Sequence, residues 1–476
     1  MFFKMKKVLT VMFMLMLIML QSTTVFAAQE ETVDLGHTLP IWSIIPFAGM
    51  LLSIAIFPLV KDIWWEKNKG YVVAFWSLLF LIPFAVGFGI QTAAEHLLEV
   101  VFGDYVTFIV LLFGLFCVAG NIELKGNLKG TPKTNVILLL IGALLASWIG
   151  TTGASMLMIR PLIRANSWRR RKVQVMVFFI FLVSNVGGCL TPVGDPPLLM
   201  GFTRGVPFFW STVELFPILV LNVVLLLVLF FFLDTRELKK DLSEGLKYQE
   251  PKTKEPLRLV GLHNIIFMAM IVVAVILSSQ LPNNVGIPIY NDIIFPLSAI
   301  IEVVIILLAA LLSFKTTKKE IREENHFTWG AISEVAILFI GIFITMIPAL
   351  IILKARGAEL GLSKPWQMFW ATGALSSFLD NTPTYLVFLT TAGTLGATGS
   401  VISTTVGDIS VKMLMAISTG AVFMGANTYI GNAPNFMVKS IAEENDIKMP
   451  SFFGYILWSL SCLIPVFIID TIVFFL

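Results

Sequence analysis

Long apolar runs alternate with short polar segments along almost the whole chain. An apolar stretch of about 20 residues is long enough to cross a bilayer as a helix. Such stretches occur at residues 40–60, 71–91, 105–122, 211–233, 264–279, 293–314, 333–353 and 452–475, and a shorter one at 93–102 fits an interfacial helix. We therefore expect helices that span a membrane. The lysine and arginine residues in the short loops indicate which loops lie on the cytoplasmic side.

Two further apolar segments carry helix breakers at their centres. The segment 134–163 is followed and preceded by basic residues, so both of its ends are expected on the cytoplasmic side, and Gly150 and Gly153 interrupt its middle. The segment 366–394 contains "LDNTP", which places an acid, an amide and a proline side by side. Each segment is predicted to be a re-entrant hairpin, because a proline costs little where no continuous helix is needed.

Two spans are interrupted by polar residues, glycine and proline. The span that begins at Val173 contains "SNVGGCLTPVGDPPLL" at 184–199, and the span at 412–439 contains "GANTYIGNAPNF" at 425–436. Unwound backbone at membrane depth is tolerated only where it lines a cavity or is buried in protein. We therefore expect both interruptions in the protein interior.

Three short motifs recur in the same order in the two halves of the chain. The pairs are "LFGLF" (112–116) with "FIGIF" (339–343), "SWIGTT" (147–152) with "SFLDNT" (377–382), and "TPVGDPPLLM" (191–200) with "TYIGNAPNFM" (428–437). The predicted topology gives the matched segments opposite directions. Inverted repeats of this kind are common in secondary transporters, whose substrate site lies near the midplane where the helix breaks meet. We expect a first repeat over 40–233, a cytoplasmic linker over 234–260 and a second, inverted repeat over 261–476.

The composition sets the class of protein. The 476 residues are 57% hydrophobic and 13% charged, whereas soluble domains are usually about 45–50% apolar and about 25% charged. No basic patch interleaved with aromatic residues, of the kind that binds nucleic acid, is present. The three cysteines lie in separate apolar runs and fit small buried residues. The predicted fold is an all-α polytopic membrane protein with about ten spanning helices, two re-entrant hairpins and two broken helices, in two inverted repeats.

Residues 1–28 have the layout of a signal peptide. Three lysines precede the apolar run 8–20, and the small residues Ala27 and Ala28 follow it. The alternative is an uncleaved anchor helix. Both interpretations put residue 30 outside the cytoplasm.

Two acidic residues lie in the interrupted segments. Asp195 is in the first broken span and Asp380 is at the tip of the second hairpin, and the residues that match them in the other half, Asn432 and Gly150, are neutral. A carboxylate at membrane depth is costly unless a proton or a cation neutralises it, and hard cations prefer oxygen ligands. We therefore expect Asp195 and Asp380 to bind a transported metal cation, Na⁺, or a proton. The polar residues expected around them are Thr151, Thr152, Ser155, Asn185, Thr191, Ser377, Asn381, Thr382, Asn427 and Asn432.

Each acid also has a purely structural interpretation. Asp380 could cap the second arm of its hairpin, and Asp195 could cap the half-helix that begins at Pro196. Glu334 could relay protons, or it could be an ordinary charge at a helix N-terminus.

If Na⁺ and H⁺ compete for one site that opens alternately to each face, the protein exchanges Na⁺ (or Li⁺) for H⁺ without a cofactor and without covalent chemistry.

Three segments resemble a known family: "SNVGGCLTPVGDPPLLMGFTRGVPFFW", "SSFLDNTPTYLVF" and "YIGNAPNFMVKSIAEE". Together they are similar to NhaD-type sodium:proton antiporters of the ion-transporter superfamily, which also holds citrate and dicarboxylate carriers and arsenite pumps. The resemblance, over residues 40–476, implies paired re-entrant hairpins, a scaffold half that carries homodimer contacts, elevator-like movement and exchange of sodium or lithium for protons. It maps Asp380 and Asn381 onto the "DN" of the family's hairpin motif and Asp195 onto the "GDP" acid. Where NhaD-type members carry "DN" in the first hairpin too, this chain has Gly150 and Thr151.

Other functions stay open from the sequence. The expected location is the bacterial cytoplasmic (inner) membrane, with lipid and small cations as partners. A sodium-coupled carrier of citrate, a dicarboxylate or another anion is the main alternative, because hydroxyl and amide residues suit a carboxylate substrate and Arg160 could assist; two midplane acids would repel an anion. A remote alternative is an intramembrane aspartyl protease that uses the two acids as acid and base. The prolines directly after Asp195 and the inverted repeat argue against it.

Overall fold

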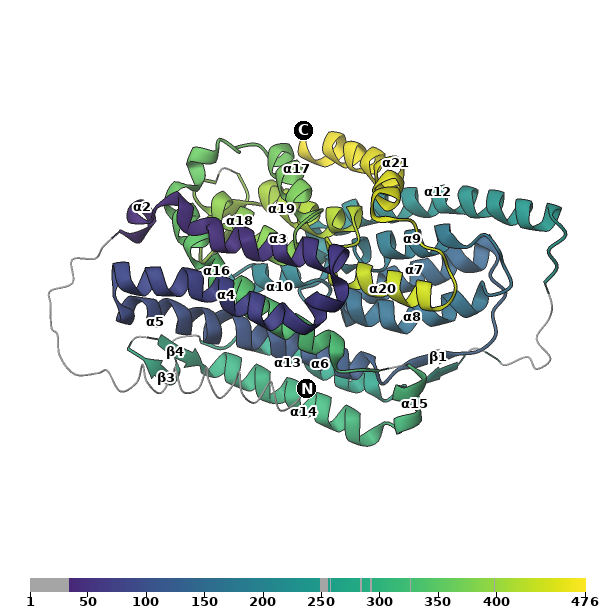
Figure 1. The fold of residues 1–476 in the computed structure, drawn as a ribbon, viewed down its shortest axis with the longest axis horizontal. Helices are drawn as coiled ribbons and strands as arrows, with labels where there is room; N and C mark the ends of the chain where they lie inside the picture. The colour runs from purple at the N-terminus through teal and green to yellow at the C-terminus, as the bar shows by residue number, and fades with distance from the viewer. Residues whose placement is uncertain are drawn as a thin grey trace.

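The computed structural model describes residues 34–248, 256, 258–282, 285–291, 293–325, 327–397 and 399–476. The expected signal peptide or anchor helix at 1–28 lies outside these described residues. Most of the described chain is helical, and each of its three small sheets holds two antiparallel strands (Figure 1). Nine helical stretches among the described residues are long and apolar enough to cross a membrane. The chain is therefore an all-α, multi-pass membrane protein, as predicted.

The first half follows the predicted order of spans. Its elements are α2 (Leu35–Thr38), η1 (Ile41–Ile44), α3 (Ile45–Val60), α4 (Asp62–Phe88), α5 (Ile90–Glu99), η2 (Val100–Tyr105), α6 (Val106–Ala119), β1 (Glu123–Lys125), α7 (Pro132–Ile149), α8 (Thr151–Ala165), α9 (Val173–Leu182), η3 (Val186–Leu190), α10 (Pro196–Thr203), α11 (Trp210–Glu214) and α12 (Phe216–Ser243). The separate interfacial helix expected at 93–102 is wrong. One helical stretch runs from Ile90 to Ala119, because the π-helical turn η2 joins α5 to α6 without a break.

The second half repeats this succession of elements. They are β2 (Arg258–Val260), α13 (Asn264–Ser278), β3 (Gly286–Tyr290), β4 (Ile293–Pro296), α14 (Leu297–Thr316), α15 (Lys319–Glu324), α16 (Gly330–Arg356), η4 (Gly357–Leu360), α17 (Pro365–Ser376), α18 (Asn381–Gly393), β5 (Val401–Thr404), β6 (Gly407–Ser410), α19 (Val411–Met424), η5 (Gly425–Asn427), α20 (Ala433–Glu444), α21 (Phe452–Asp470) and η6 (Thr471–Phe475). Strand β2 pairs with β1 and so connects the two halves.

Each segment expected to be a hairpin is a pair of helices packed against each other. Helices α7 and α8 are separated only by Gly150, whose φ of 78° is a backbone conformation that favours glycine. The two helices are held together at the end away from Gly150 by a hydrogen bond from Gly130 N to Ala165 O (2.8 Å). Two hydrogen bonds between the side-chain amides of Asn135 and Asn166 (2.9 and 2.8 Å) also hold this end. Helices α17 and α18 also pack together, and residues 377–380 separate them.

A buried ion pair fixes the open end of the first hairpin to its neighbours. Arg169 Nη2 lies 2.8 Å from Asp234 Oδ1, and both side chains are fully buried. Asn135 and Gln174 also donate to the Asp234 carboxylate, at 3.0 and 2.8 Å. The sequence placed Asp234 at the start of a polar linker over 234–260. The linker instead begins as helix, because α12 continues to Ser243 and uses these residues to hold α7 and α9.

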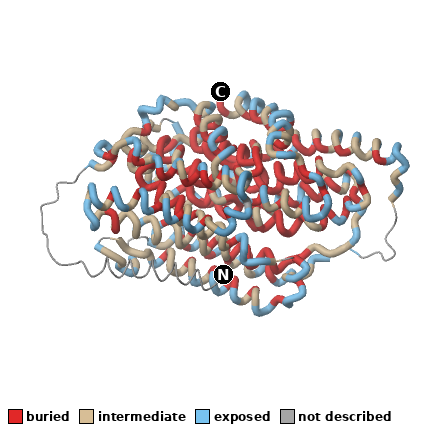
Figure 2. Tube along the Cα trace, viewed as in Figure 1, coloured by how far each residue is buried: buried red, intermediate tan, exposed pale blue. Residues whose placement is uncertain are grey.

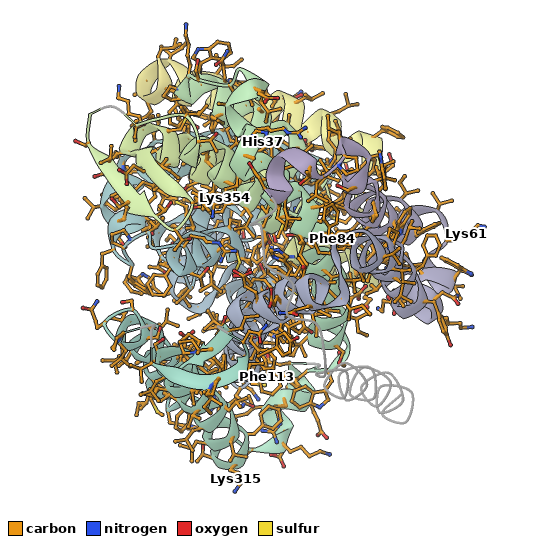
Figure 3. The ribbon with its side chains drawn as sticks, turned by 90° about the vertical axis from the view of Figure 1, so that its left-hand side faces the viewer. His37, Lys61, Phe84, Phe113, Lys315 and Lys354 are labelled. Atoms are coloured by element: carbon orange, nitrogen blue, oxygen red, sulfur yellow. The ribbon has the colours of Figure 1, made fainter. Side chains whose placement is uncertain are left out.

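The two broken spans form the centre of the molecule. Nine of the ten residues of α9 are buried, and Figure 2 shows that buried residues are concentrated in the middle of the fold. Helices α3, α4 and α14 lie at the periphery, where Lys61 and Lys315 project away from the rest of the chain (Figure 3). The expectation that both interruptions lie in the interior is confirmed for the described residues.

Candidate functional site

Four helices begin at the centre of the fold, where the hairpins and the broken spans are interrupted. Helix α8 begins after Gly150, α10 after Asp195, α18 after Asp380 and α20 after Asn432. The first residues of a helix leave backbone N–H groups without intrahelical partners and carry a partial positive charge. The centre of the fold therefore combines four such helix ends from both halves of the chain.

Asp195 is the point where these helix starts meet. Its Oδ1 accepts a hydrogen bond from Thr151 Oγ1 at 3.0 Å and one from Asn432 Nδ2 at 3.3 Å, and its Oδ2 accepts one from Asn381 Nδ2 at 2.7 Å. Only 1% of the Asp195 surface is exposed. The side chain does not cap α10, although its backbone occupies the cap position. We call Asp195, Thr151, Asn381 and Asn432 the Asp195 cluster.

The Asp195 carboxylate is held by neutral groups. Within the described ranges, no lysine, arginine or histidine forms an ion pair with it, and all three of its side-chain partners are a hydroxyl or an amide. No group of three or more His, Cys, Asp or Glu side chains that could hold a metal ion occurs in the part of the chain that the structure describes. A cation at this position would therefore contact the Asp195 carboxylate and neutral oxygen atoms of the cluster.

Asn432 and Asp195 are matched in the repeated motif and touch each other. Both precede a short helix with almost the same extended backbone, at φ −142°, ψ 139° for Asp195 and φ −150°, ψ 141° for Asn432. Asn432 Nδ2 also approaches Ser184 O (3.1 Å) and Asn185 Oδ1 (3.3 Å). Asn185 in turn donates to Asn435 Oδ1 at 2.7 Å. Asn185 is thus connected to Asp195 through Asn432, and it links the two broken spans.

Thr191, Ser377 and Asn427 hold the interrupted backbone rather than the carboxylate. Thr191 Oγ1 donates to Ser147 O, and Thr428 Oγ1 donates to Ser377 O at 2.5 Å. Thr191 matches Thr428 and Ser147 matches Ser377 in the repeated motifs. Each hairpin is therefore bound to the broken span of its own half by the same hydrogen bond. Asn427 Nδ2 donates to Ser377 Oγ at 2.9 Å. We infer that this set shapes the centre from one layer further out.

Asp380 lies beside the cluster but its carboxylate bonds its own helix. Asp380 Oδ1 accepts a hydrogen bond from Thr382 N at 2.9 Å, which is an ordinary helix cap. Thr382 Oγ1 is 3.5 Å from Asn381 Oδ1. Thr152 is half-buried, and no hydrogen bond from it to Asp195 is found among the described residues. The structure therefore brings Thr151, Asn381 and Asn432 directly to Asp195, and leaves Asp380, Thr382 and Thr152 adjacent to that group.

Glu334 faces a different partner. Its Oε1 lies 3.1 Å from Lys69 Nζ of α4, and Lys69 also pairs with Glu66 at 3.0 Å. The side chain of Lys69 is only 8% exposed and that of Glu334 is 33% exposed, so this ion pair is partly buried. Glu334 thus joins α16 to α4 in this structure.

Several buried polar residues were missed by the sequence analysis. Asn435 is fully buried and donates to Gly425 O (2.8 Å) and Thr428 O (2.9 Å), while it accepts from Asn185. The signal was the second asparagine in "GNAPNF", inside a segment at membrane depth. Asn222 and Asp470 form another buried pair, in which Asn222 Nδ2 lies 2.8 and 2.9 Å from the two carboxylate oxygens. Their pairing joins α12 to α21, and no motif in the sequence connects them.

The chain matches a known protein family. The profile of a family described as "putative citrate transport" matches residues 36–475, which include both halves and every residue of the Asp195 cluster. Among curated proteins, none matches the chain.

Proposed function

The chain belongs to the putative citrate transport family, and we propose that it is a secondary transporter that exchanges Na⁺ (or Li⁺) for H⁺ by alternating access. The observation that carries this proposal is the Asp195 cluster. The Asp195 carboxylate is buried at the centre of the fold, neutral hydrogen-bond donors hold it, and no basic side chain of the described residues neutralises it. Such a group can accept either a proton or a small cation.

The proposed site uses the cluster in two forms. Without Na⁺, the Thr151 hydroxyl and the amides of Asn381 and Asn432 donate to Asp195. With Na⁺ bound, the same residues would present their oxygen atoms to the ion, because hard cations prefer oxygen ligands. Rotating a hydroxyl or an amide is enough to exchange donor for acceptor. Competition then follows directly, since the cation and the proton neutralise the same carboxylate.

The remaining predicted residues take secondary roles in this proposal. Asp380 and Thr382 are next to the cluster and would complete the oxygen shell with Thr152, while Asn185, Thr191, Ser377 and Asn427 hold the helix breaks in place. Glu334 would relay protons only if its pair with Lys69 opens.

The hairpins would be re-entrant, in a bacterial cytoplasmic (inner) membrane, and the two halves would be inverted repeats that expose the site to each face in turn. A homodimer is compatible with this arrangement.

The proposal is tested with the purified full chain in sealed proteoliposomes that contain a pH-sensitive dye. We expect a Na⁺ or Li⁺ pulse to drive proton flux in the absence of any organic anion, with K⁺ as the comparison ion. Asp195→Asn should reduce that flux to the level of empty liposomes. Asp408→Asn, which removes an exposed acid on β6, is the matched control and should transport normally.

The affinity for Na⁺ gives a second, independent readout. If Na⁺ and H⁺ share Asp195, the apparent Na⁺ affinity should weaken as the pH falls. An affinity that is constant between about pH 6 and pH 9 would contradict a shared site, and so would normal flux in Asp195→Asn.

A carrier of citrate or a similar anion is the second candidate. Two observations favour it besides the family's description. Four helix starts converge at the Asp195 cluster, and helix N-termini stabilise anions. In addition, Arg160 on α8 has a buried Nη1 without a hydrogen-bond partner among the described residues. Flux that requires citrate, together with uptake of labelled citrate that Arg160→Gln abolishes, would establish this function in place of cation exchange.

A further inference from the structure

Helix α12 is longer than a membrane span needs to be. Its 28 residues make a helix of about 42 Å at about 1.5 Å per residue, whereas the hydrocarbon core of a bilayer is about 30 Å thick. Figure 1 shows its C-terminal end extending beyond α7 and α9. Phe232, which is 67% exposed, is the last large apolar residue on the outer side of α12 before its charged residues begin. Arg236 and Lys239 follow about 6 and 10 Å further along the axis, which is the depth of lipid headgroups next to the core.

The charged end of α12 has two faces with different surroundings. The acidic face is bound to the loop before α9, where Arg171 pairs with Asp241 (2.9 Å) and with Glu244 (2.5 Å). On the opposite face, Arg236 and Lys239 are exposed and form no ion pair in the described part of the chain. The three acidic residues Glu237, Asp241 and Glu244 are paired with the three basic residues Arg170, Arg171 and Lys240. The positive charge of Arg236 and Lys239 on the outward face is therefore uncompensated.

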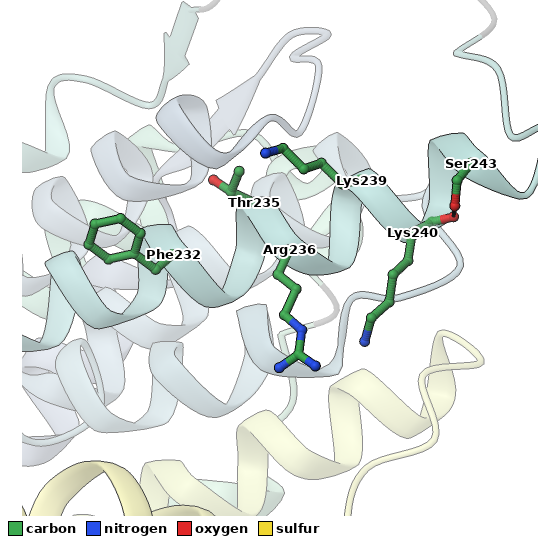
Figure 4. Close-up of a pocket in the computed structure, with 6 residues that line it drawn as sticks. All are labelled: Phe232, Thr235, Arg236, Lys239, Lys240 and Ser243. Atoms are coloured by element: carbon green, nitrogen blue, oxygen red, sulfur yellow. Dashed lines mark hydrogen bonds between the residues drawn. The ribbon is translucent and has the colours of Figure 1, made fainter.

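A shallow groove, open to solvent and formed by side chains of α12 alone, runs along this basic face. Its volume is about 510 Å³, and it is lined by Phe232, Thr235, Arg236, Lys239, Lys240 and Ser243. Figure 4 shows Thr235 and Lys239 on one side of the helix and Arg236 and Lys240 on the other. Lys240 is partly neutralised by Glu237 at 2.6 Å. The hydroxyl of Thr235 is buried without a hydrogen-bond partner among the described residues, which is unusual for a polar atom.

We propose that this groove binds the phosphate of an anionic phospholipid in the leaflet beside it. Arg236 and Lys239 supply the positive charge at headgroup depth, and Phe232 lies where the acyl chains begin. Threonine in a helix occupies two χ1 rotamers, so one rotation brings the Thr235 hydroxyl into the groove, where it can donate to a phosphate oxygen. This inference does not depend on the transported species, and its test does not measure transport.

The test is native mass spectrometry of the purified full chain in detergent. The protein is titrated with phosphatidylglycerol, or with phosphatidylcholine that has the same acyl chains. We expect tighter binding of phosphatidylglycerol. The double variant Arg236→Gln/Lys239→Gln should lower that affinity by about 30-fold, which is about 1 kcal/mol for each basic residue near a membrane surface. Thr235→Val, which keeps the shape and the charge, should lower it by about 2- to 10-fold.

A matched control separates a specific site from the general positive charge of this side of the protein. Lys315→Gln/Lys318→Gln removes two exposed lysines near the end of α14 and should leave phosphatidylglycerol binding unchanged. Equal loss in this control, or equal affinity for the two lipids in the unaltered protein, would overturn the proposal. Displacement of the lipid by inorganic phosphate at the same concentration would also overturn it, since the groove would then be a site for soluble anions.

Discussion

At the scale of single residues, two aspartates with the same chemistry are used differently. Asp195 accepts hydrogen bonds from three side chains at the starts of three other helices and caps nothing with its side chain. Asp380 accepts from the backbone of Thr382 and caps α18. The sequence allowed both interpretations for both acids, because aspartate is suited both to capping a helix and to binding a cation. Only the direction of each side chain distinguishes the two.

A pair of substitutions separates the charge of Asp380 from its cap. Asparagine caps helices about as well as aspartate, so Asp380→Asn should keep the thermal stability of the protein, while Asp380→Ala should lose about 0.5–2 kcal/mol. Under the proposed exchange, both variants should lose Na⁺-driven proton flux, because both remove a charge beside the Asp195 cluster. Thermal unfolding in detergent and dye-monitored flux measure the two effects. Full flux in Asp380→Asn would confine this residue to its cap.

At the scale of elements, the helix breaks position the site and the helix ends are fixed by polar contacts. The hairpin α7–α8 has its open end fixed by the Arg169–Asp234 pair, and its turn is tied to the first broken span through Thr191 and Ser147. Such partners are needed wherever these ends are buried, because unpaired backbone and charged groups are costly in the protein interior. These contacts make α7, α8, α9 and α12 one packed unit.

Loss of the buried ion pair should destabilise this unit strongly. Arg169→Ala leaves the Asp234 carboxylate buried without its cation, which typically costs about 3–5 kcal/mol. The adjacent Arg170→Ala is the matched control, since Arg170 is 64% exposed and lies 3.8 Å from Glu244. It should cost less than about 1 kcal/mol. Thermal unfolding of both variants in the same detergent gives the comparison, and equal losses would show that Asp234 does not depend on Arg169.

The contact between β1 and α15 should make stability depend on pH. Burial, and then the hydrogen bond with Glu324, raise the pKa of Glu123, whereas Lys125 holds the pKa of Glu324 below its usual value. An acid with a raised pKa favours the folded state when protonated, and this contribution is lost as the pH rises through the raised pKa. Glu123→Gln should therefore raise the melting temperature at about pH 8 and do so less at about pH 4. A gain that is the same at both pH values would contradict this assignment.

At the scale of the whole molecule, matched residues of the two halves make equivalent contacts or contact each other. Thr191 and Thr428 make the same bond to the hairpin beside them, and Asp195 contacts its own counterpart, Asn432. Contact between matched residues is expected where a pseudo-two-fold axis passes between two repeats. At this contact the two halves differ only in that the first has the acid Asp195 where the second has the amide Asn432.

Exchanging these two residues tests that relation. In Asp195→Asn/Asn432→Asp the carboxylate moves to the matched position, where Asn185, Ser184 and the amide introduced at position 195 would surround it. We expect the double variant to recover part of the Na⁺-driven flux that Asp195→Asn alone loses, as measured in the same proteoliposomes. If the flux does not recover although the double variant is normally folded, a carboxylate at position 432 cannot replace the one at position 195.

Much of the fold could be predicted from the sequence, but less of the site. Apolar run lengths, basic loops and the positions of Gly150 and Pro383 predict the spans and the hairpins, because these features act locally. The extension of α12 was missed, since a charged helical end and a polar linker have the same composition. Thr151, Asn381 and Asn432 could be named as neighbours of Asp195 through the repeated motif. The Asn222–Asp470 pair could not, because it depends on how α12 and α21 pack.

The three hydrogen bonds to Asp195 have a consequence for ion dehydration. A carboxylate offers about four lone-pair directions, and Thr151, Asn381 and Asn432 occupy three of them. An ion that reaches this closed centre must exchange nearly all of its water shell for protein oxygen atoms. Stripping water costs more for Li⁺ than for Na⁺ and more for Na⁺ than for K⁺. The order in which these ions are accepted therefore measures how completely the protein replaces water.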